Sequence, residues 1–299
     1  MTECIGKPLN FTAVGGRPIA ADFSGGTITS DGGALLLREA DRQLGLIRAL
    51  DAALPDPRSP KLLLHPQQTM LAQRIFGIAC GYEDLNDHDQ LRHDPLWQNL
   101  TDHPTTDAAL ASSPTLCRLE NRVDRTSLWR MAAALVDCFI ASHATPPDEL
   151  LLDFDATDDA VHGHQENRFF HGYYDHYCFL PLYVYAGDRL LAAYLRPANI
   201  DGAYQAKAIL KLLVDRLRAA WPNVRIAIRA DSGFCRWRML RWCDSHDIRY
   251  VVGLARNSVL EAELAPLSER VCEQFQSDGQ AHREFTEFCY KAGTWNRAR

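Results

Sequence analysis

The sequence predicts a mixed α/β protein, and two observations carry this prediction. In the second half of the chain, apolar runs of strand length and helical stretches follow one another in the order strand, strand, strand, helix, strand, helix, strand. Three successive strands followed by alternating helices and strands are typical of a mixed sheet flanked by helices. In the first half the apolar residues recur at helical spacing. We therefore expect a mainly helical N-terminal domain in residues 1–147 and the sheet domain in residues 148–299.

Composition limits the class of protein. With 46% apolar and 23% charged residues, the 299-residue chain has the composition of a protein with a packed core. Its nine cysteines show no C-x-x-C spacing and are expected to be reduced thiols. The sequence shows neither a secretory signal nor an apolar run of membrane-spanning length, so we expect a cytoplasmic protein without a membrane partner. The net charge of -6 means that any contact with nucleic acid must come from local basic patches.

Residues 8–29 predict one or two short strands or an extended arm, because apolar residues alternate loosely with glycine and polar residues. The apolar residues concerned are Phe11, Val14, Ile19, Phe23 and Ile28. Two nearby glycine pairs, in Ser24-Gly25-Gly26 and Asp31-Gly32-Gly33, resemble phosphate-binding loops. Neither pair is followed by Lys-Ser/Thr or placed in a strand-to-helix G-x-G-x-x-G motif, so both are interpreted as turns.

Four helices with an apolar face are predicted before the domain boundary. The first begins at Ser30 or Asp31 and continues to about residue 54, and the second occupies about residues 66–80 and ends at Gly81. Ser113-Pro114, a cap followed by a first-turn proline, begins a helix that continues to about residue 124, and an apolar helix follows at about residues 128–140. The predicted inward-facing residues of the first two helices are Leu36, Ala40, Leu44, Ile47, Leu50, Leu54, Met70, Leu71, Ile75, Phe76 and Ala79.

Two polar features of this half have alternative interpretations. Residues 82–95 are rich in aspartate and histidine, but they lack a defined ligand spacing and are interpreted as a solvated helix with caps. On the helix that begins at Pro114, Arg118, Arg122 and Arg125 fall on one side at positions i, i+4 and i+7. Such a row fits a surface that follows a phosphate backbone, and it fits a solvated face as well.

The second half begins after the Pro-rich residues 143–148, which have the composition of a linker. A strand at about residues 150–155 is followed by a polar, aromatic loop at residues 162–176 and by a hairpin with its turn at residues 186–189. The other predicted strands are residues 179–185, 190–195, 224–229, 249–254 and 284–290, and the predicted helices are about residues 203–220, 231–246 and 260–275.

Two aspartates stand at the ends of predicted strands. Asp155 closes the first strand and Asp231 directly follows the fourth, so their carboxylates meet if these two strands are neighbours. Carboxylates held that close repel unless a cation lies between them, and hard oxygen ligands suit Mg²⁺ or Mn²⁺. Two such ions can activate a water or a 3′-hydroxyl and stabilise the leaving oxygen of a phosphodiester. Asp153 is a weaker candidate ligand because we expect it on the other face of the strand, and Asp158 and Asp159 are interpreted as turn residues.

Several segments resemble one known family, the DDE transposases of bacterial insertion sequences, group 1. In the second half these are LDFDATDDAVHGHQ (152–165), FHGYYDHYCFLPLYVYAGDRLLAAYLRPANIDG (170–202), IRADSGFCR (228–236) and YVVGLARN (250–257). In the first half they are SDGGALLLREADRQLGL (30–46), IACGYEDLNDHDQLRHDP (78–95) and SSPTLCRLENRV (112–123). The strand order is similar to that of the ribonuclease H-like fold, and the resemblance extends over nearly the whole chain.

The resemblance implies a fold, a reaction and its residues. Asp155, before Ala156-Thr157, and Asp231, in the Asp-Ser-Gly turn, would be catalytic and would hold Mg²⁺ or Mn²⁺ in a ribonuclease H-like domain. The reaction would be hydrolysis at the ends of the element, followed by attack of the 3′-hydroxyl on target DNA. The partners would be the terminal inverted repeats, which the N-terminal domain would bind, the target DNA, and further copies of the chain on DNA.

The basic residues near the second aspartate, Arg229, Arg236, Arg238 and Arg256, are interpreted either as phosphate contacts or as partners of nearby carboxylates. Of these, Arg236 and Arg256 join the three aligned arginines of the first half as the predicted DNA contacts.

The sequence departs from the family in one respect. The family's third acidic residue is a glutamate in a Tyr-x-x-Arg-x-x-x-Glu-like motif, and no such motif follows Asn257. We therefore expect a C-terminally truncated transposase without its third metal ligand. The alternative is a catalytically inactive fragment that binds only DNA or full-length transposase.

Other types of site have weaker support. Four histidines, His162, His164, His171 and His176, lie near Asp158 and Asp159, but their spacing matches no standard zinc pattern. They are interpreted as lining a substrate channel or as forming local hydrogen bonds. A Ser-His-Asp hydrolase is not supported because the chain has no G-x-S-x-G motif.

Overall fold

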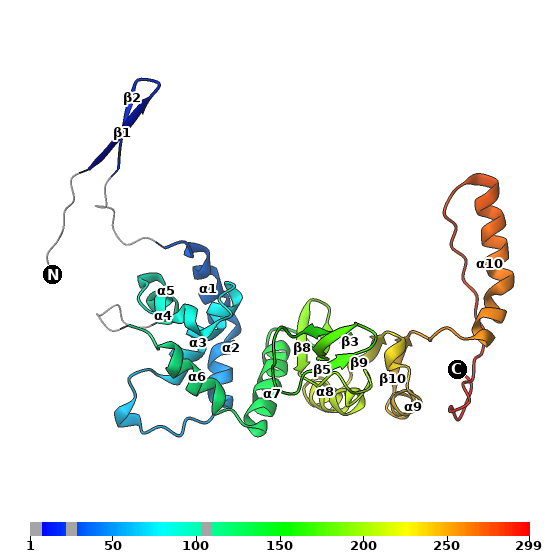
Figure 1. The fold of residues 1–299 in the computed structure, drawn as a ribbon. Helices are drawn as coiled ribbons and strands as arrows, with labels where there is room; N and C mark the ends of the chain where they lie inside the picture. The colour runs from blue at the N-terminus through cyan, green and yellow to red at the C-terminus, as the bar shows by residue number, and fades with distance from the viewer. Residues whose placement is uncertain (1–7, 22–28, 103–108) are drawn as a thin grey trace. The chain divides into compact units, whose positions relative to one another are not determined.

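The computed structural model describes residues 8–21, 29–102 and 109–299 (Figure 1). The predictions for Phe23, Ile28 and Ser24-Gly25-Gly26 therefore lie outside the described residues. The chain divides into two compact units, Met1–Leu128 and Trp129–Arg299. This division falls within helix α7 (Arg125–Ala141) and not at residues 143–148, where the sequence places it. The reason is that Val136 and Phe139 of α7 are buried in the core of the second unit.

The described part of the first unit begins with an antiparallel hairpin, which is the two-strand alternative of the prediction for this segment. Strands β1 (Leu9–Val14) and β2 (Arg17–Ala21) are joined at Gly15 and Gly16, which both have positive φ. Phe11 and Ile19 are cross-strand partners, and both side chains are exposed. A single hairpin has little stability of its own in water.

The helices of the first unit follow the hairpin. They are η1 (Gly32–Ala34), α1 (Leu35–Leu44), α2 (Leu46–Ala53), η2 (Pro60–Leu62), α3 (Gln67–Ala79), η3 (Leu85–Asp87), α4 (His88–Leu91), α5 (Pro95–Leu100) and α6 (Ser113–Asn121). The single helix predicted up to residue 54 is wrong, because Gly45 adopts a left-handed conformation (φ 69°) and separates α1 from α2. The break changes which face is inward: Leu36 and Leu44 are exposed, whereas Ile47 and Leu54 are buried.

Helix α3 and the segment after it form the centre of this unit. The helix predicted at residues 66–80 is confirmed, with Pro66 as its cap and Met70, Leu71 and Phe76 buried, but Ala79, also predicted to face inward, is exposed. The prediction of a solvated helix at residues 82–95 is wrong. His88 is fully buried, lies 3.4 Å from Gln73 (Nδ1 to Nε2) and meets the Trp97 ring edge-on. The capping part of that prediction is confirmed, since the carboxylates of Asp84 and Asp94 accept hydrogen bonds from backbone N–H groups.

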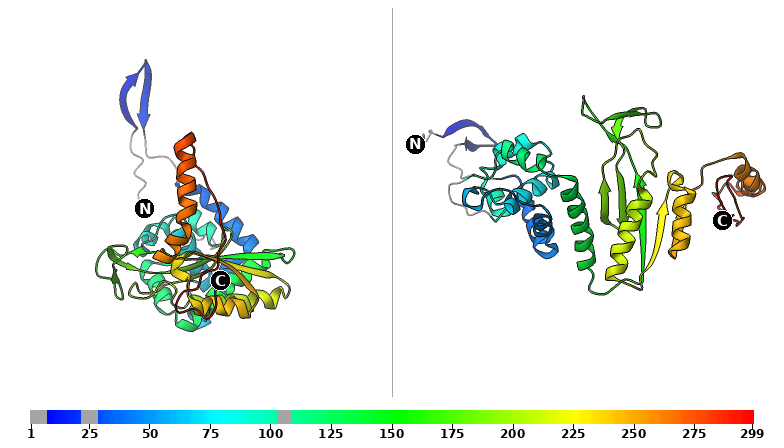
Figure 2. Two further views of the ribbon diagram at one scale, coloured as in Figure 1. Left: turned by 90° about the vertical axis from the view of Figure 1, so that its right-hand side faces the viewer. Right: turned by 90° about the horizontal axis from the view of Figure 1, so that it is seen from below.

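The second unit contains the predicted mixed sheet. Its strands are β3 (Glu149–Ala156), β7 (Leu182–Ala186), β8 (Arg189–Tyr194), β9 (Arg225–Ala230) and β10 (Ile248–Val252). They lie in the order β10-β9-β3-β7-β8 (Figures 1 and 2). Strands β9 and β10 are parallel to β3, β7 is antiparallel to β3, and β8 is antiparallel to β7. Helix α8 (Ala206–Ala220) crosses from β8 to β9, and helix α9 (Trp237–Ser245) connects the parallel neighbours β9 and β10, which need such a crossover.

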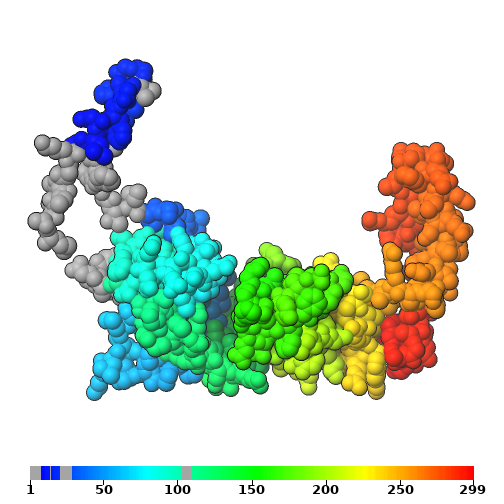
Figure 3. Space-filling model, viewed as in Figure 1, coloured from blue at the N-terminus to red at the C-terminus, as the bar shows by residue number. Residues whose placement is uncertain are grey.

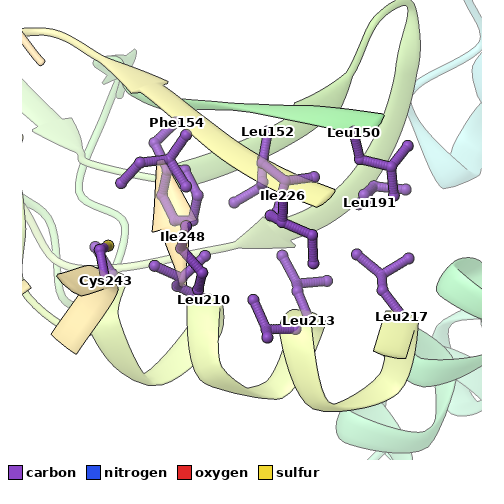
Figure 4. Packing of buried hydrophobic residues seen from close by; sticks show 14 of the residues in the cluster. Leu150, Leu152, Phe154, Leu191, Leu210, Leu213, Leu217, Ile226, Cys243 and Ile248 are labelled. Carbon is purple, nitrogen blue, oxygen red and sulfur yellow. The ribbon is translucent and has the colours of Figure 1, made fainter. Parts of the chain in front are cut away.

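One face of this sheet carries the core. Alternate residues of β3, namely Leu150, Leu152 and Phe154, are buried together with Leu213 and Leu217 of α8 (Figure 4). Each fully buried leucine contributes roughly 1.5–3 kcal/mol through removal of its surface from water. Because side chains alternate along a strand, the residues between them point to the opposite face.

The opposite face is polar along its central strands. Arg249 of β10 forms an ion pair with Glu149 of β3 (2.7 Å), and Arg225 of β9 lies 3.8 Å from the same carboxylate. Leu151, the next residue of β3 on this face, is exposed. The charged pairs and the exposed leucine distinguish this face from the apolar face under α8.

A second, small sheet follows β3 in the chain. It consists of β4 (Asp159–Ala160), β6 (His176–Phe179) and β5 (Phe169–His171) in the order β4-β6-β5. The predicted loop at residues 162–176 is therefore partly strand, and the predicted strand at residues 179–185 is two strands, β6 and β7, which belong to different sheets.

The last part of the second unit is helix α10 (Ser258–Asp278) and the segment that follows it. The strand predicted at residues 284–290 is wrong, because these residues have no regular secondary structure. The segment contacts α9, where the guanidinium groups of Arg297 and Arg299 both lie 2.8 Å from the carboxylate of Asp244.

Candidate active site

Asp155 lies near the end of β3, on the polar face of the large sheet. Its side chain is exposed, and its cross-strand neighbour on β7 is Tyr183. Among the described residues it forms no ion pair with a lysine, arginine or histidine. The alternation of the strand explains this position, because Leu152 and Phe154 occupy the core face and leave Asp155 on the other.

Asp231 directly follows β9 and caps the short helix η4 (Ser232–Phe234). Its Oδ1 accepts a hydrogen bond from the backbone N–H of Gly233 (2.9 Å). The expectation that the first and fourth predicted strands are neighbours is confirmed, because β3 and β9 pair in parallel with Phe154 opposite Ala230. Asp155 and Asp231 are the next residues in this register, on strands about 4.8 Å apart. The sheet therefore brings the two aspartates together.

Asp153 has a different environment from Asp155. The expectation that it lies on the other face is wrong, since residues two apart on a strand share a face. The two aspartates differ because only Asp153 has an ion-pair partner among the described residues. The guanidinium of Arg229, which lies opposite Asp153 on β9, contacts both carboxylate oxygens of Asp153 at 2.5 and 2.8 Å. Asp153 is therefore neutralised, and the carboxylate of Asp155 is the available one on this strand.

The turn at Asp231 is held by a close approach of backbones. Gly253, just after β10, donates its N–H to the carbonyl of Ala230 (3.1 Å). A Cβ atom on Gly253 would lie only 2.9 Å from the backbone nitrogen of Ser232. Only glycine therefore fits at this position without displacing the turn that carries Asp231.

Tyr174 is a residue of this region that the sequence did not single out. Its hydroxyl donates to the carbonyl of Ala156 (3.4 Å). Burial raises the pKa of Tyr174, and the negative charges of Asp158, Asp155 and Asp231 raise it further. The phenol therefore stays protonated and remains a hydrogen-bond donor beside both aspartates. The tyrosine-rich segment directly after the strand is the sequence signal that points to it.

The histidines near the site have local partners. Nε2 of His176 lies 2.7 Å from Oδ2 of Asp158, so Asp158 is more than a turn residue. His164 contacts Arg168 (3.0 Å), and Nδ1 of His171 accepts from the N–H of Tyr173 (3.3 Å). In the three described stretches of the chain, no group of three or more His, Cys, Asp or Glu side chains is placed to hold a metal ion.

The arginines predicted on one helix do not form a row. Helix α6 ends at Asn121, so Arg118 lies on α6, whereas Arg125 begins α7. Arg122 contacts the carboxylate of Asp56 (3.1 Å) and the side-chain oxygen of Gln67, and only 18% of its side chain is exposed. Arg118 donates to the hydroxyl of Thr115 and is exposed, as is Arg125. The structure thus gives Arg122 an internal partner and leaves the other two at the surface.

The arginines of the second unit also differ from each other. Arg236 contacts the carboxylate of Asp201 (2.6 Å). Burial acts to raise the pKa of Asp201, but hydrogen bonds from Arg236 and from the N–H of Ala203 hold it below its usual range. Arg256, after β10, is exposed at a surface hollow that Leu254 and Leu260 also line.

The comparison with protein families decides the identity. Residues 11–299 match the family described as Transposase DDE domain group 1. The chain belongs to this DDE transposase family. No curated protein matches it. In the parts of this DDE transposase that the structure describes, no helix is long and apolar enough to cross a membrane.

Two solved structures show low similarity to the DDE transposase chain. One is the simian T-cell lymphotropic virus intasome in complex with PP2A regulatory subunit B56 gamma (13% identity, 57% of this chain and 52% of that chain covered, TM-score 0.25). The other is the piggyBac transposase synaptic complex with hairpin DNA (14% identity, 75% of this chain and 51% of that chain covered, TM-score 0.35). The chain spans about half the length of each of these proteins.

The two aspartates fit the divalent metal ions that DDE transposases generally use. Magnesium is usually held by one or two carboxylates, with waters and substrate phosphates completing its shell. Asp155 and Asp231 supply two such carboxylates from rigid strand ends, and Asp155 has no competing cation among the described residues.

Proposed function

We propose that this protein is a DNA transposase in which Asp155 and Asp231 form the catalytic metal site, with Mg²⁺ or Mn²⁺ as cofactor. The observation that carries the proposal is the pairing of β3 with β9. It places the two carboxylates of a DDE family member side by side on the polar face of the sheet. A bound divalent ion would polarise the phosphodiester and activate the attacking oxygen.

We infer a ribonuclease H-like fold for the second unit. The inference is supported by the strand order β10-β9-β3-β7-β8, by the antiparallel β3-β7-β8 meander, and by the two parallel strands added through helical crossovers. These features match the order of elements by which the sequence resembles that fold. The helical first unit would then bind the ends of the element.

The proposed reaction has two steps at phosphorus. In the first, a water oxygen attacks a phosphodiester at the end of the element, the P–O3′ bond breaks, and the leaving oxygen takes a proton to become a free 3′-hydroxyl. In the second, that hydroxyl attacks a phosphodiester of target DNA and displaces another 3′-oxygen. Asp155 and Asp231 would hold the divalent ion against which the phosphate is positioned, and the Tyr174 hydroxyl would keep the end of β3 in place through Ala156.

DNA is the proposed partner, and several copies of the chain are proposed to assemble on it in the cytoplasm. The exposed arginines Arg118, Arg125 and Arg256 are the proposed phosphate contacts, since no carboxylate holds them among the described residues. Arg122 and Arg236, which already have internal carboxylate partners, would contribute less to DNA binding.

A second candidate function is DNA binding without cleavage. It is favoured by the presence of two gathered carboxylates, and no third acidic or histidine ligand, among the described residues. With fewer protein ligands, more of the ion's shell must come from water and substrate. Such a chain would occupy the ends of the element or bind a full-length transposase, and would leave strand transfer to that transposase.

Three substitutions test the catalytic proposal. Asp155→Asn and Asp231→Asn remove a charge without changing side-chain shape, and each should lower the Mg²⁺-dependent nicking of terminal-repeat DNA on the order of a hundredfold or more. Asp153→Asn is the matched control, because it removes a charge two residues away on the same face, where Arg229 already neutralises it. It should change the nicking rate by less than about threefold.

The outcome separates the two functions. Nicking that survives both Asp155→Asn and Asp231→Asn would rule out the two-aspartate site. Wild-type protein that binds terminal-repeat DNA but nicks it with neither Mg²⁺ nor Mn²⁺ would favour the binding-only function.

A further inference from the structure

The small sheet after β3 presents an aromatic surface. Phe170 of β5 and Tyr177 of β6 are cross-strand partners with ring centroids 5.7 Å apart, and about half of each side chain is exposed (51% and 48%). The guanidinium carbon of Arg168 lies 4.4 Å from the centre of the Tyr177 ring. Tyr173, in the turn between the two strands, is 85% exposed. We call Phe170, Tyr173, Tyr177 and Arg168 the aromatic platform. The segment that contains it, residues 150–180, is drawn in green in Figure 3 and forms part of the surface seen there.

The composition of this segment is aromatic and polar. Residues 162–178 include five aromatic residues and four histidines but no leucine, isoleucine, valine or methionine. A surface built of rings, with a guanidinium stacked on one of them, offers flat π faces and a cation. Aromatic residues and arginine are also enriched at protein interfaces, so the position of the platform beside the candidate active site, and not its composition alone, favours DNA as the ligand.

The platform rests on a rigid base. On the other side of the small sheet, Cys178, Leu180 and Ala198 are buried together. Arg196 is buried beneath them and donates hydrogen bonds from Nε to the carbonyl of Leu180 (2.8 Å) and from Nη1 to the carbonyl of Tyr204 (2.7 Å). The backbone N–H of Leu180 in turn donates to the carbonyl of Arg196 (2.8 Å). Exposed rings on such a support can receive a ligand without being reordered, which lowers the entropic cost of binding.

The platform adjoins the candidate active site through Tyr174. The rings of Tyr173 and Tyr174 meet edge-on with centroids 5.0 Å apart. The hydroxyl of Tyr174 donates to the carbonyl of Ala156, the residue after Asp155. A ligand on the platform would therefore lie one aromatic residue away from the end of β3.

Acidic and basic groups both lie near the platform. Asp158 lies 2.7 Å from Nε2 of His176, Asp175 is exposed in the turn between β5 and β6, and Arg168 contacts His164 (3.0 Å). The cationic group closest to the rings is thus Arg168, which suits an anionic chain that passes over the platform.

We propose that the aromatic platform binds unpaired nucleobases of the DNA strand that is processed at Asp155 and Asp231. The proposal rests on the proposed transposase function, since cleavage at an element end frees a strand terminus next to the site. Bases stack on aromatic rings with little dependence on sequence, because every base has a π face, and a nearby arginine adds attraction for the phosphate chain.

The test compares DNA with and without bases. Full-length protein is titrated with fluorescein-labelled single-stranded oligothymidylate and with an abasic oligonucleotide of equal length, and binding is followed by fluorescence anisotropy. Phe170→Ala and Tyr177→Ala should each weaken binding of oligothymidylate about tenfold and leave binding of the abasic strand unchanged. Phe285→Ala, which removes an aromatic side chain of equal exposure to Tyr173 (85%) outside the platform, should change neither. Phe170→Trp, which keeps a stacking ring, should restore binding.

The possible outcomes are distinct. Equal losses on both oligonucleotides would mean that the rings support the fold or the charge of the surface, and the proposal would be overturned. Unchanged DNA binding with a change in oligomeric state by light scattering would make the platform a protein interface, which also overturns it. Base-dependent losses in the platform variants, together with nicking that is insensitive to Asp155→Asn, would reject the proposed catalytic site and leave the platform standing.

Discussion

At the scale of the residue, neighbours decide what each carboxylate does. Asp153 and Asp155 share a strand and a face, yet Arg229 contacts both oxygens of the first and leaves the second without an ion-pair partner among the described residues. Asp201 is held by Arg236, and Asp158 by His176. The aspartates suited to a metal are therefore Asp155 and Asp231, which have no cationic partner among the described residues.

The carboxylate of Asp56 stabilises the fold, because it pairs with the guanidinium groups of Arg58 and Arg122. A hydrogen bond from the Arg58 side chain is the main reason that its pKa falls from 3.8 to about 2; burial opposes this shift, and the backbone N–H of Arg58 and the charges of Arg58 and Arg122 add to it. Because the folded state lowers this pKa, the carboxylate stabilises the fold above about pH 4, and the stabilisation is lost as the pH falls toward 2.

We expect Asp56→Asn to lower the free energy of unfolding at pH 7 by on the order of 1–2 kcal/mol. The difference from wild type should shrink as the pH falls from about 4 to about 2, the range in which the wild-type carboxylate becomes protonated. Urea unfolding at a series of pH values measures both effects. Asp188→Asn, at an exposed residue of the β7–β8 turn, serves as the control and should have no effect. A difference that stays constant across this pH range would contradict the assigned cause.

At the scale of the element, strand ends and tight turns set the site. β3, β9 and β10 run parallel, so their C-terminal ends meet at one edge of the sheet. Asp231 caps η4 at this edge, and the backbone after β10 passes so close to it that Gly253 has no room for a side chain.

Because the backbones approach so closely at Gly253, adding a single methyl group there should strongly reduce activity. In Gly253→Ala, the added methyl group would meet the backbone nitrogen of Ser232 at 2.9 Å, so the turn that carries Asp231 must shift. We expect the rate of nicking of terminal-repeat DNA to fall at least about tenfold. A displacement of roughly 1 Å at a catalytic group can lower a reaction rate by about a hundredfold. DNA affinity, measured by gel shift, should stay within about twofold of wild type.

Gly293→Ala is the matched control for this change, since a methyl group there meets no atom within 4 Å. It should leave nicking unchanged. Equal nicking by Gly253→Ala and wild type would show that the turn tolerates the displacement.

At the scale of the whole molecule, the chain consists of two units that each have a hydrophobic core. Trp97, Leu100 and Leu110 are fully or almost fully buried in the first unit, and Leu152, Leu182 and Leu210 in the second. Helix α7 belongs mostly to the second unit, because Phe139 is buried there and its ring lies 5.9 Å from that of Trp221.

This assignment can be tested with two fragments. A fragment of residues 125–299, which keeps α7, should unfold cooperatively. A fragment of residues 148–299 lacks Val136 and Phe139 and should be less stable by on the order of 3 kcal/mol, the value of two buried apolar side chains. Thermal unfolding followed by circular dichroism compares the two. Equal midpoints would instead place the boundary at residues 143–148, as the sequence predicts.

Much of the secondary structure followed from local pattern. The short apolar run that begins at Leu150 and is interrupted by carboxylates marked β3, and the Pro66 start and apolar spacing marked α3. The failures have physical causes as well. Gly45 ended a helix that periodicity alone continued, and the aromatic segment after β3 formed a sheet whose strands were too short to be recognised by their pattern.

The sequence by itself determined the family, the mixed α/β class and the two aspartates at strand ends, because these depend on the order of residues along the chain. Only the tertiary structure decided which aspartate of β3 is available, that Arg122 has an internal partner, and that an aromatic platform adjoins the site. The physical reason is that a side chain's charge state and accessibility depend on neighbours far away in sequence, such as Arg229, 76 residues from Asp153. Those neighbours are brought together only when the strands pair.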